Sequence, residues 1–153
     1  FSTVWNYNDF QKFIPGVGDS TVLHREKQRV WVYQRLVLPG PLHDRHYIML
    51  STHTKSSQSH FDQYVIDWRL DDHFPLPSVS GTPVVPLDFQ GCWDIRTGLA
   101  GGLDATYAIE IDLGGLIPNW LARAALRQYL INLMDALYQR LNTKNAQDQS
   151  SDR

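Results

Sequence analysis

The feature that most constrains this chain is its C-terminal quarter. After Pro118 the sequence contains no glycine and no further proline, and five leucines recur at spacings of four, three, four and four residues: Leu126, Leu130, Leu133, Leu137 and Leu141. This spacing aligns them on one face of an α-helix, predicted over about 118–142 with Pro118 in its first turn. Because such an apolar face must be buried, the rest of the chain has to supply a surface that covers it.

The segments before this helix are typical of β-strands. β-branched and aromatic residues cluster between turn residues, and they predict six strands over about 20–26, 29–38, 45–53, 62–70, 84–96 and 104–113. Short links such as residues 39–41 and 98–102 favour an antiparallel meander. Residues 71–83 are longer and rich in proline, which predicts a compact surface loop, and residues 8–14 predict one short helix before Pro15.

Composition narrows the class of protein. The chain has 153 residues, 42% of them hydrophobic, which predicts one domain over 1–142 and a disordered polar tail over 143–153. The formal net charge is -2 and the basic residues are scattered, so nucleic acid is not an expected partner. Cys92 is the only cysteine, which excludes an internal disulfide.

The sequence shows no membrane-spanning run and no signal-peptide order in residues 1–20. The protein is therefore expected to be soluble, in the cytoplasm or the periplasm. Six antiparallel strands and one long amphipathic helix bury their apolar faces most simply when the sheet curves around the helix. The predicted fold class is α+β, a curved antiparallel sheet wrapped around a C-terminal helix, with space between them for an apolar ligand.

The junction between the last strand and this helix also resembles a known family. Residues 112–121, Asp-Leu-Gly-Gly-Leu-Ile-Pro-Asn-Trp-Leu, resemble the Asp-Pro-Gly-Gly-x-Ile-Pro-x-Trp-Leu junction of START domains, with Leu113 in place of proline. Further similarities follow in the expected order: Trp5 with 10–17, then 38–47, then 91–95. The resemblance covers about 4–141 and is closest to bacterial START-like proteins.

The resemblance implies a helix-grip fold, of which the six strands would be the last six of nine. The first strands and first helix would then be absent from this sequence, and an open sheet edge could pair with another copy of the chain to form an oligomer. It also implies noncatalytic binding of a lipid, which many START domains carry between membranes. No cofactor and no metal are expected. The alternatives that share the fold are a polyketide aromatase or cyclase and a ligand-sensing module.

Two residues match family positions that face the lipid tunnel. Arg45 matches an arginine that points into the tunnel in several members, although Gln34 stands where its acidic partner would be. The alternative for Arg45 is a solvated position at a strand edge. Tyr107 matches a tunnel-facing tyrosine, and alternation along its strand places Ile109 on the same side while Glu110 and Asp112 face outward.

Alternation along the other strands, and the leucine face of the helix, complete the predicted ligand-binding set. For each member, ordinary core packing is the alternative. The set is Val32, Gln34, Arg45, Tyr47, Met49, Tyr64, Ile66, Trp68, Phe89, Trp93, Tyr107, Ile109, Leu126 and Leu130.

Apolar residues near the start of the helix predict a transient contact with a membrane surface. The first helical turn contains more apolar surface than a free helix end normally exposes, from Leu116, Ile117, Trp120 and Leu121. In the family fold the loop with Phe74 and Leu76 lies nearby, so the predicted membrane contacts are Phe74, Leu76, Ile117 and Trp120. The alternative is that these residues seal one end of the core.

Other chemistry is weakly supported. His43 and His46 are three apart, so in a strand they would point to opposite faces and could share a metal only if the chain turned between them. The serines near His53 and His60 lack a nucleophile elbow, which argues against a hydrolase. Arg45 and Tyr107 are a thin set for proton transfer, which favours a binding protein over an enzyme.

Overall fold

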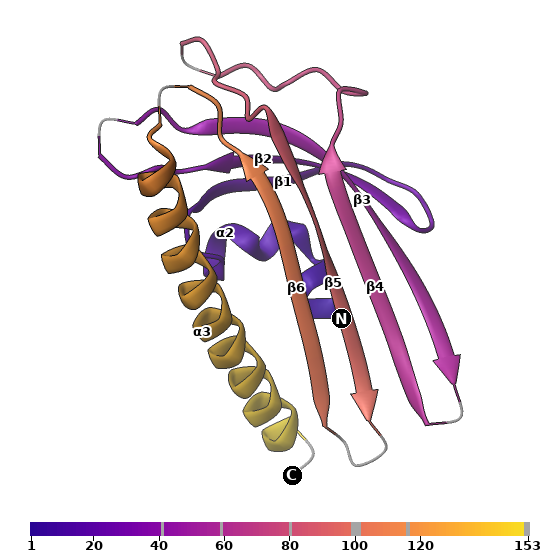
Figure 1. Ribbon diagram of the computed structural model, residues 1–153. Coiled ribbons are helices and arrows are strands. Elements are labelled where there is room, and N and C mark those ends of the chain that lie inside the picture. The colour runs from indigo at the N-terminus through magenta and orange to yellow at the C-terminus, as the bar shows by residue number, and fades with distance from the viewer. Residues whose placement is uncertain (41, 59, 80, 99–101, 116, 152–153) are drawn as a thin grey trace.

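The computed structural model describes residues 1–151 except 41, 59, 80, 99–101 and 116. It consists of one antiparallel sheet with a long helix along one side (Figure 1). Each strand pairs with the next in the order β1 to β6, which confirms the predicted meander. The strands are β1 Val17–Arg25, β2 Arg29–Leu36, β3 Arg45–Gln58, β4 Phe61–Leu70, β5 Asp88–Gly98 and β6 Leu103–Asp112.

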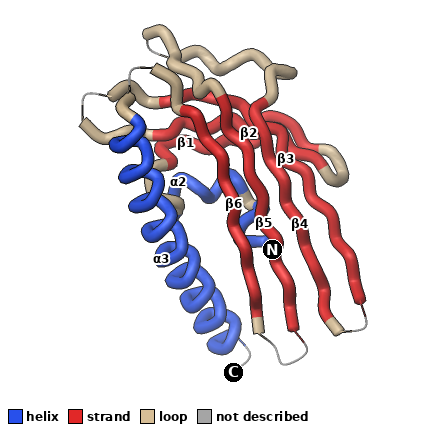
Figure 2. The backbone as a smooth tube through the Cα atoms, in the orientation of Figure 1, coloured by secondary structure: helices blue, strands red, loops and turns tan. Residues whose placement is uncertain are grey.

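The helices lie at the two ends of the sequence. Three short turns, α1 (Ser2–Trp5), the 3-10 helix η1 (Tyr7–Asp9) and α2 (Phe10–Phe13), precede the sheet, and α3 (Asn119–Ser151) follows it. Figure 2 shows the N-terminal turns and α3 on the same side of the curved sheet. The predicted helix over 8–14 is therefore two shorter elements, η1 and α2, and α1 was not predicted.

The face of the sheet toward these helices forms the main core. Strand register places inward residues next to one another, as in the pairs Ile66 with Trp93 and Trp93 with Tyr107. This alternation confirms the inward faces predicted from the sequence. The same apolar cluster includes Val4 and Tyr7 from the N-terminal turns, and from α3 it includes Leu133 and Leu137.

The outer face of the sheet has a second, smaller apolar cluster formed by Trp31, Tyr33, Ile48 and Leu50. Phe74 and Leu76 pack against it, and Trp31 Nε1 donates a hydrogen bond to Asp71 Oδ1 at 3.2 Å. The expected position of Phe74 and Leu76 beside a cavity mouth is therefore wrong. They cover the outer face because β2 and β3 are apolar on both faces there.

The C-terminal tail also differs from expectation. Residues 143–151, predicted to be disordered, continue α3. This stretch contains neither glycine nor proline, so no residue ends the helix, and the Thr143 hydroxyl donates to the Gln139 carbonyl one turn earlier. None of the described helices combines the length and apolar character that crossing a bilayer requires.

The sheet has two edge strands, β1 and β6. An edge strand presents unpaired backbone groups on one side, which allows pairing with another chain. Formation of an oligomer through such an edge stays a prediction.

Candidate functional site

A cavity of about 810 Å³ lies between the inner face of the sheet, the N-terminal turns and α3. This volume is within the range of small-molecule sites in proteins. Most of its wall is apolar or aromatic. The sheet contributes Gln34, Leu36, Tyr47, Met49, Trp68, Phe89, Trp93, Tyr107, Ile109 and Ile111, the N-terminal turns Val4, Tyr7 and Phe10, and α3 Leu126, Tyr129 and Leu133.

Most of the predicted ligand-binding residues line this cavity, and some do not. Those along its wall are Gln34, Tyr47, Met49, Trp68, Phe89, Trp93, Tyr107, Ile109 and Leu126. Val32 and Ile66 are instead completely buried in the core, and Tyr64 stacks on Phe1 at a ring distance of 4.7 Å. Leu130 is half-buried and is not part of the wall. Ligand contact by the lining residues stays a prediction.

The sequence reasoning missed the contribution of the N-terminal turns and of Tyr129. Tyr7 and Phe10 are aromatic neighbours with ring centroids 4.7 Å apart, and their spacing of three residues was a helical signal. Tyr129 lies just off the leucine face of α3, one residue before Leu130. The predicted apolar face of the helix was defined by leucines alone, so it did not include Tyr129.

One wall of the cavity is an aromatic surface built on Gly91. The rings of Trp68 and Tyr107 stack at 5.4 Å with an interplanar angle of 22°, and Trp93 lies 4.4 Å from Tyr107. A Cβ atom on Gly91 would lie within 3.0 Å of the Trp68 ring and of the Ala108 carbonyl oxygen. The absence of a side chain at Gly91 is therefore what lets the Trp68 ring approach the backbone of β5 closely.

Polar groups of the cavity wall are bonded to one another. The Tyr47 hydroxyl donates to Gln34 Oε1 at 3.0 Å, and Gln34 Nε2 donates to the Ser20 hydroxyl at 3.0 Å. Tyr7 and Ser51 share a hydrogen bond of 2.7 Å between their hydroxyls. Burial raises the pKa of Tyr7 and of Tyr47, so both phenols are neutral at physiological pH.

Tyr107 on β6 and Tyr129 on α3 line the cavity from the sheet and from the helix. Burial raises the pKa of both. The nearby Tyr47 and Tyr7 raise the pKa of Tyr107 further. Tyrosines from four elements therefore surround the same space.

Arg45 does not line the cavity, which corrects the expectation that it faces a ligand. Nor is it solvated at a strand edge, since its relative exposure is 4%. Its guanidinium donates to the carbonyls of His43, of Leu113 at 2.6 Å and of Gly114 at 3.1 Å. These bonds satisfy a buried charge with peptide dipoles, so that Arg45 fastens the link between β6 and α3 to the start of β3.

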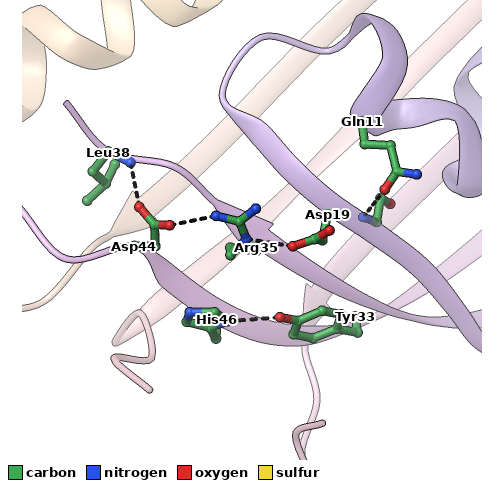
Figure 3. Close-up of polar contacts among 8 residues, drawn as sticks. Gln11, Asp19, Tyr33, Arg35, Leu38, Asp44 and His46 are labelled. Atoms are coloured by element: carbon green, nitrogen blue, oxygen red, sulfur yellow. Dashed lines mark hydrogen bonds and ion pairs between the residues drawn. The ribbon is translucent and has the colours of Figure 1, made fainter. Parts of the chain in front are cut away.

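The loop between β2 and β3 is held in place by charged residues on the outer face (Figure 3). Arg35 donates to Asp19 Oδ2 at 2.6 Å and to Asp44 Oδ2 at 2.9 Å, and Asp44 Oδ1 accepts from the Leu38 amide at 3.3 Å. The two carboxylates raise the pKa of Arg35. Because Leu38 and Pro39 line the cavity, this network positions part of its wall.

Apolar side chains are exposed at the end of the cavity where α3 begins. Val37 and Leu87 line the cavity and have relative exposures of 43% and 74%, and Ile117 lines it as well. Trp120 follows in the first turn of α3, with an exposure of 72%. We call Val37, Leu87, Ile117 and Trp120 the apolar rim. Leu116 lies outside the described residues.

The chemistry available in the site is limited. In the part of the chain that the structure describes, no three metal-binding side chains come together. Apart from tyrosines, the ionisable side chains in the described wall are Asp112 and Arg123, and both are exposed. The buried wall therefore offers hydrogen bonds and apolar contact rather than acid–base pairs.

Comparisons with known proteins identify the architecture. No protein-family model matches the chain. It is 27% identical over 126 residues to an uncharacterized protein from Pseudomonas aeruginosa, a match that covers 82% of this chain and 60% of that relative's length. Among solved structures, a STAR-related lipid transfer protein from Xanthomonas axonopodis has a TM-score of 0.78 at 22% identity, covering 92% of this chain and 76% of the other. The chain therefore has the helix-grip fold of START-like domains.

Proposed function

We propose that this protein binds a hydrophobic ligand, a lipid, in the cavity between the sheet and α3, and that it transfers this ligand between membranes without catalysing a reaction. The observation that supports the proposal most strongly is the cavity itself, about 810 Å³ with an apolar and aromatic wall. Each 100 Å² of ligand surface buried there would contribute about 2.5 kcal/mol. The STAR-related lipid transfer protein with the same fold agrees with this function.

Transfer requires a transient contact with a membrane, for which the apolar rim is suited. Leu87 and Trp120 are large apolar side chains at the end of the cavity, and both are mostly exposed. A tryptophan side chain is favoured in the headgroup region of a bilayer. A lipid that leaves the membrane at this end could enter the cavity without crossing water.

Two adjacent alanines of α3 provide a direct test. Ala125 lines the cavity, whereas Ala124 is exposed and is not part of the wall. An Ala125→Phe variant adds a ring inside the cavity, and Ala124→Phe adds the same ring outside it. The proposal predicts that Ala125→Phe loses most lipid uptake from vesicles while its unfolding free energy changes little, and that Ala124→Phe binds like the wild type.

Lipid uptake is measured by incubating each purified protein with mixed-lipid vesicles, separating the two and identifying co-purified lipids by mass spectrometry. A wild-type protein that takes up no lipid would contradict the proposed function. Equal uptake by Ala125→Phe and wild type would place the ligand elsewhere.

A further inference from the structure

The long helix α3 has a second apolar face that the cavity does not use. Ile131, Met134 and Tyr138 follow one another at spacings of three and four residues, so their side chains lie within about 60° of one another around the helix axis. Their relative exposures are 50%, 42% and 69%. None of the three belongs to the cavity wall, whereas Leu133, which lies between them in sequence, does. The helix therefore has apolar side chains toward the cavity and again toward the outside.

This outer face of α3 has the composition of a protein-binding surface. Arg127 lies one turn before Ile131 in the same row, and we call Arg127, Ile131, Met134 and Tyr138 the outer stripe. The helix runs along one side of the molecule, with the outer stripe exposed (Figure 1). Aromatic residues, methionine and arginine are enriched in protein interfaces. Asp135 lies next to Met134 and is exposed, and its charge would be repelled by anionic headgroups, which favours a protein over a membrane as the partner.

The order of residues in the outer stripe makes it complementary to itself. Arg127 and Ile131 are four residues apart, and so are Met134 and Tyr138. If two copies of α3 pack antiparallel with Ile131 opposite Met134 of the second copy, the two-fold symmetry also places Arg127 opposite Tyr138 of the second copy. The guanidinium group of each copy then lies beside the tyrosine ring of the other, where a cation–π contact forms.

Charge favours this antiparallel arrangement over a parallel one. Neither Arg127 nor Asp135 has a hydrogen-bond or ion-pair partner among the described residues. In the antiparallel pair, Asp135 lies within one turn of the residue that faces Arg127 of the second copy, so the carboxylate and the guanidinium attract each other. A parallel pair in register would instead place each of these charges beside its own copy, and both contacts would be repulsive.

From these observations we infer that α3 binds a second copy of this chain through the outer stripe and forms an antiparallel, two-fold symmetric dimer. The inference goes beyond the proposed function and does not depend on it, because the cavity lies on the other face of the helix. The paired segment over residues 127–138 is only about 17 Å long. An interface of that size is at the small end of specific ones, so a dissociation constant on the order of 10–100 µM is expected.

Sedimentation equilibrium of the chain from roughly 5 to 500 µM brackets this dissociation constant and tests the dimer. The mass of the wild type should rise from 17.6 kDa toward twice that value. Ile131→Glu places a charge in the middle of the interface and should weaken association at least about tenfold. Gln139→Glu adds the same charge at an exposed position of α3 outside the outer stripe and should associate like the wild type. A wild type that stays monomeric throughout would overturn the inference, and so would wild-type association by Ile131→Glu.

Exchange of two charges tests the antiparallel arrangement. In the dimer, Arg127→Asp and Asp135→Arg each bring like charges together, whereas the double variant restores opposite charges. The double variant should therefore associate more tightly than either single variant. Weaker association of the double variant would overturn the antiparallel arrangement. Circular dichroism establishes that each variant is folded.

Lipid uptake separates this inference from the proposed function. Ile131 lies outside the cavity wall, so Ile131→Glu should take up lipid from vesicles like the wild type while it fails to dimerise. A wild type that dimerises but takes up no lipid would overturn the proposed function alone. A monomeric wild type whose association with vesicles is lost in Ile131→Glu would overturn the dimer and assign the outer stripe to a membrane surface.

Discussion

Gly91 is the residue on which the aromatic wall of the cavity most depends. Trp68 lies against its backbone, and any side chain at this position would overlap the indole ring and the carbonyl of Ala108. We expect Gly91→Ala to displace Trp68 and to lower the free energy of unfolding by about 1–3 kcal/mol, the usual cost of overpacking.

Gly102 provides the matched control for this prediction, because a Cβ atom there meets no atom within 4 Å. Chemical denaturation of Gly91→Ala and Gly102→Ala measures the difference. Equal stability of the two variants would show that Trp68 is not held by the glycine. A shift in tryptophan emission of Gly91→Ala alone would report the displaced ring.

His53 is a residue whose burial predicts a pH effect. Its ring lies 4.4 Å from Trp5 and 5.3 Å from Phe1, and its Nδ1 atom is buried without a hydrogen-bond partner among the described residues. Burial, assisted by the charge of Arg25, lowers the pKa of His53 below its ordinary value of 6.5. The folded protein therefore binds this proton less readily than the unfolded chain does.

The direction of the pH effect follows from this difference. Above pH 6.5 His53 is neutral in both states, so it adds no pH dependence. As the pH falls below 6.5, the unfolded chain is protonated first, and the free energy of unfolding decreases until the pH passes the lowered pKa of the folded state. Denaturation between pH 7 and 5 should show a smaller decrease for His53→Gln than for wild type. His60→Gln, at an exposed turn position, should keep the wild-type decrease.

Among the elements, those with a regular pattern were predictable from sequence. The strands alternate inward and outward because one face of each is buried, and the leucine spacing of α3 reports its apolar face. The loop over 71–83 has no such period. Its residues Phe74 and Leu76 are placed by the apolar outer face of β2 and β3, a tertiary effect that the loop sequence does not contain.

Arg45 illustrates the same limit for a site residue. Sequence similarity identified the position, but the direction of its side chain depends on carbonyl groups of Leu113 and Gly114, which are nearly 70 residues away along the chain. Gly114 and Gly115 both have positive φ angles, so the link turns these carbonyls in a way that most residues would resist. No local pattern encodes that contact.

The contact makes a prediction about the attachment of α3. An Arg45→Met substitution removes the buried guanidinium together with its three hydrogen bonds to backbone carbonyls. We expect the free energy of unfolding to fall by about 2–4 kcal/mol. Arg35→Met, at a partly exposed ion pair, should cost about 1 kcal/mol or less. Denaturant titration compares them. A stable Arg45→Met variant with impaired lipid binding would instead indicate that Arg45 contacts the ligand.

On the scale of the whole molecule, the sequence predicted a sheet around a helix but not the size of the space between them. Cavity-lining and core residues have the same composition, and Ile66 and Trp68 on one strand face differ only in whether another side chain or the cavity lies opposite. The N-terminal turns close part of this space with Val4 and Tyr7. This role of the N-terminal turns depends on how the two ends of the chain pack together, which the residue pattern within each strand does not predict.

The apolar rim determines how the whole molecule should meet a membrane. The double variant Leu87→Ser with Trp120→Ala removes two exposed apolar side chains from the end of the cavity where α3 begins. Each would contribute about 1.5–3 kcal/mol when buried in a bilayer. We therefore expect vesicle association and the rate of lipid transfer between vesicles to fall at least about tenfold.

The equilibrium amount of lipid bound should fall much less than the transfer rate, because Leu87 is 74% exposed at the end of the cavity and the aromatic wall is intact in this variant. Leu103 is the control, since it is 51% exposed at the opposite end of β6 from the rim (Figure 1). A Leu103→Ala protein should transfer lipid at the wild-type rate. If Leu103→Ala slows transfer as much as the rim variant, the protein meets the membrane with a different surface, and lipid must enter the cavity from the other end of the sheet.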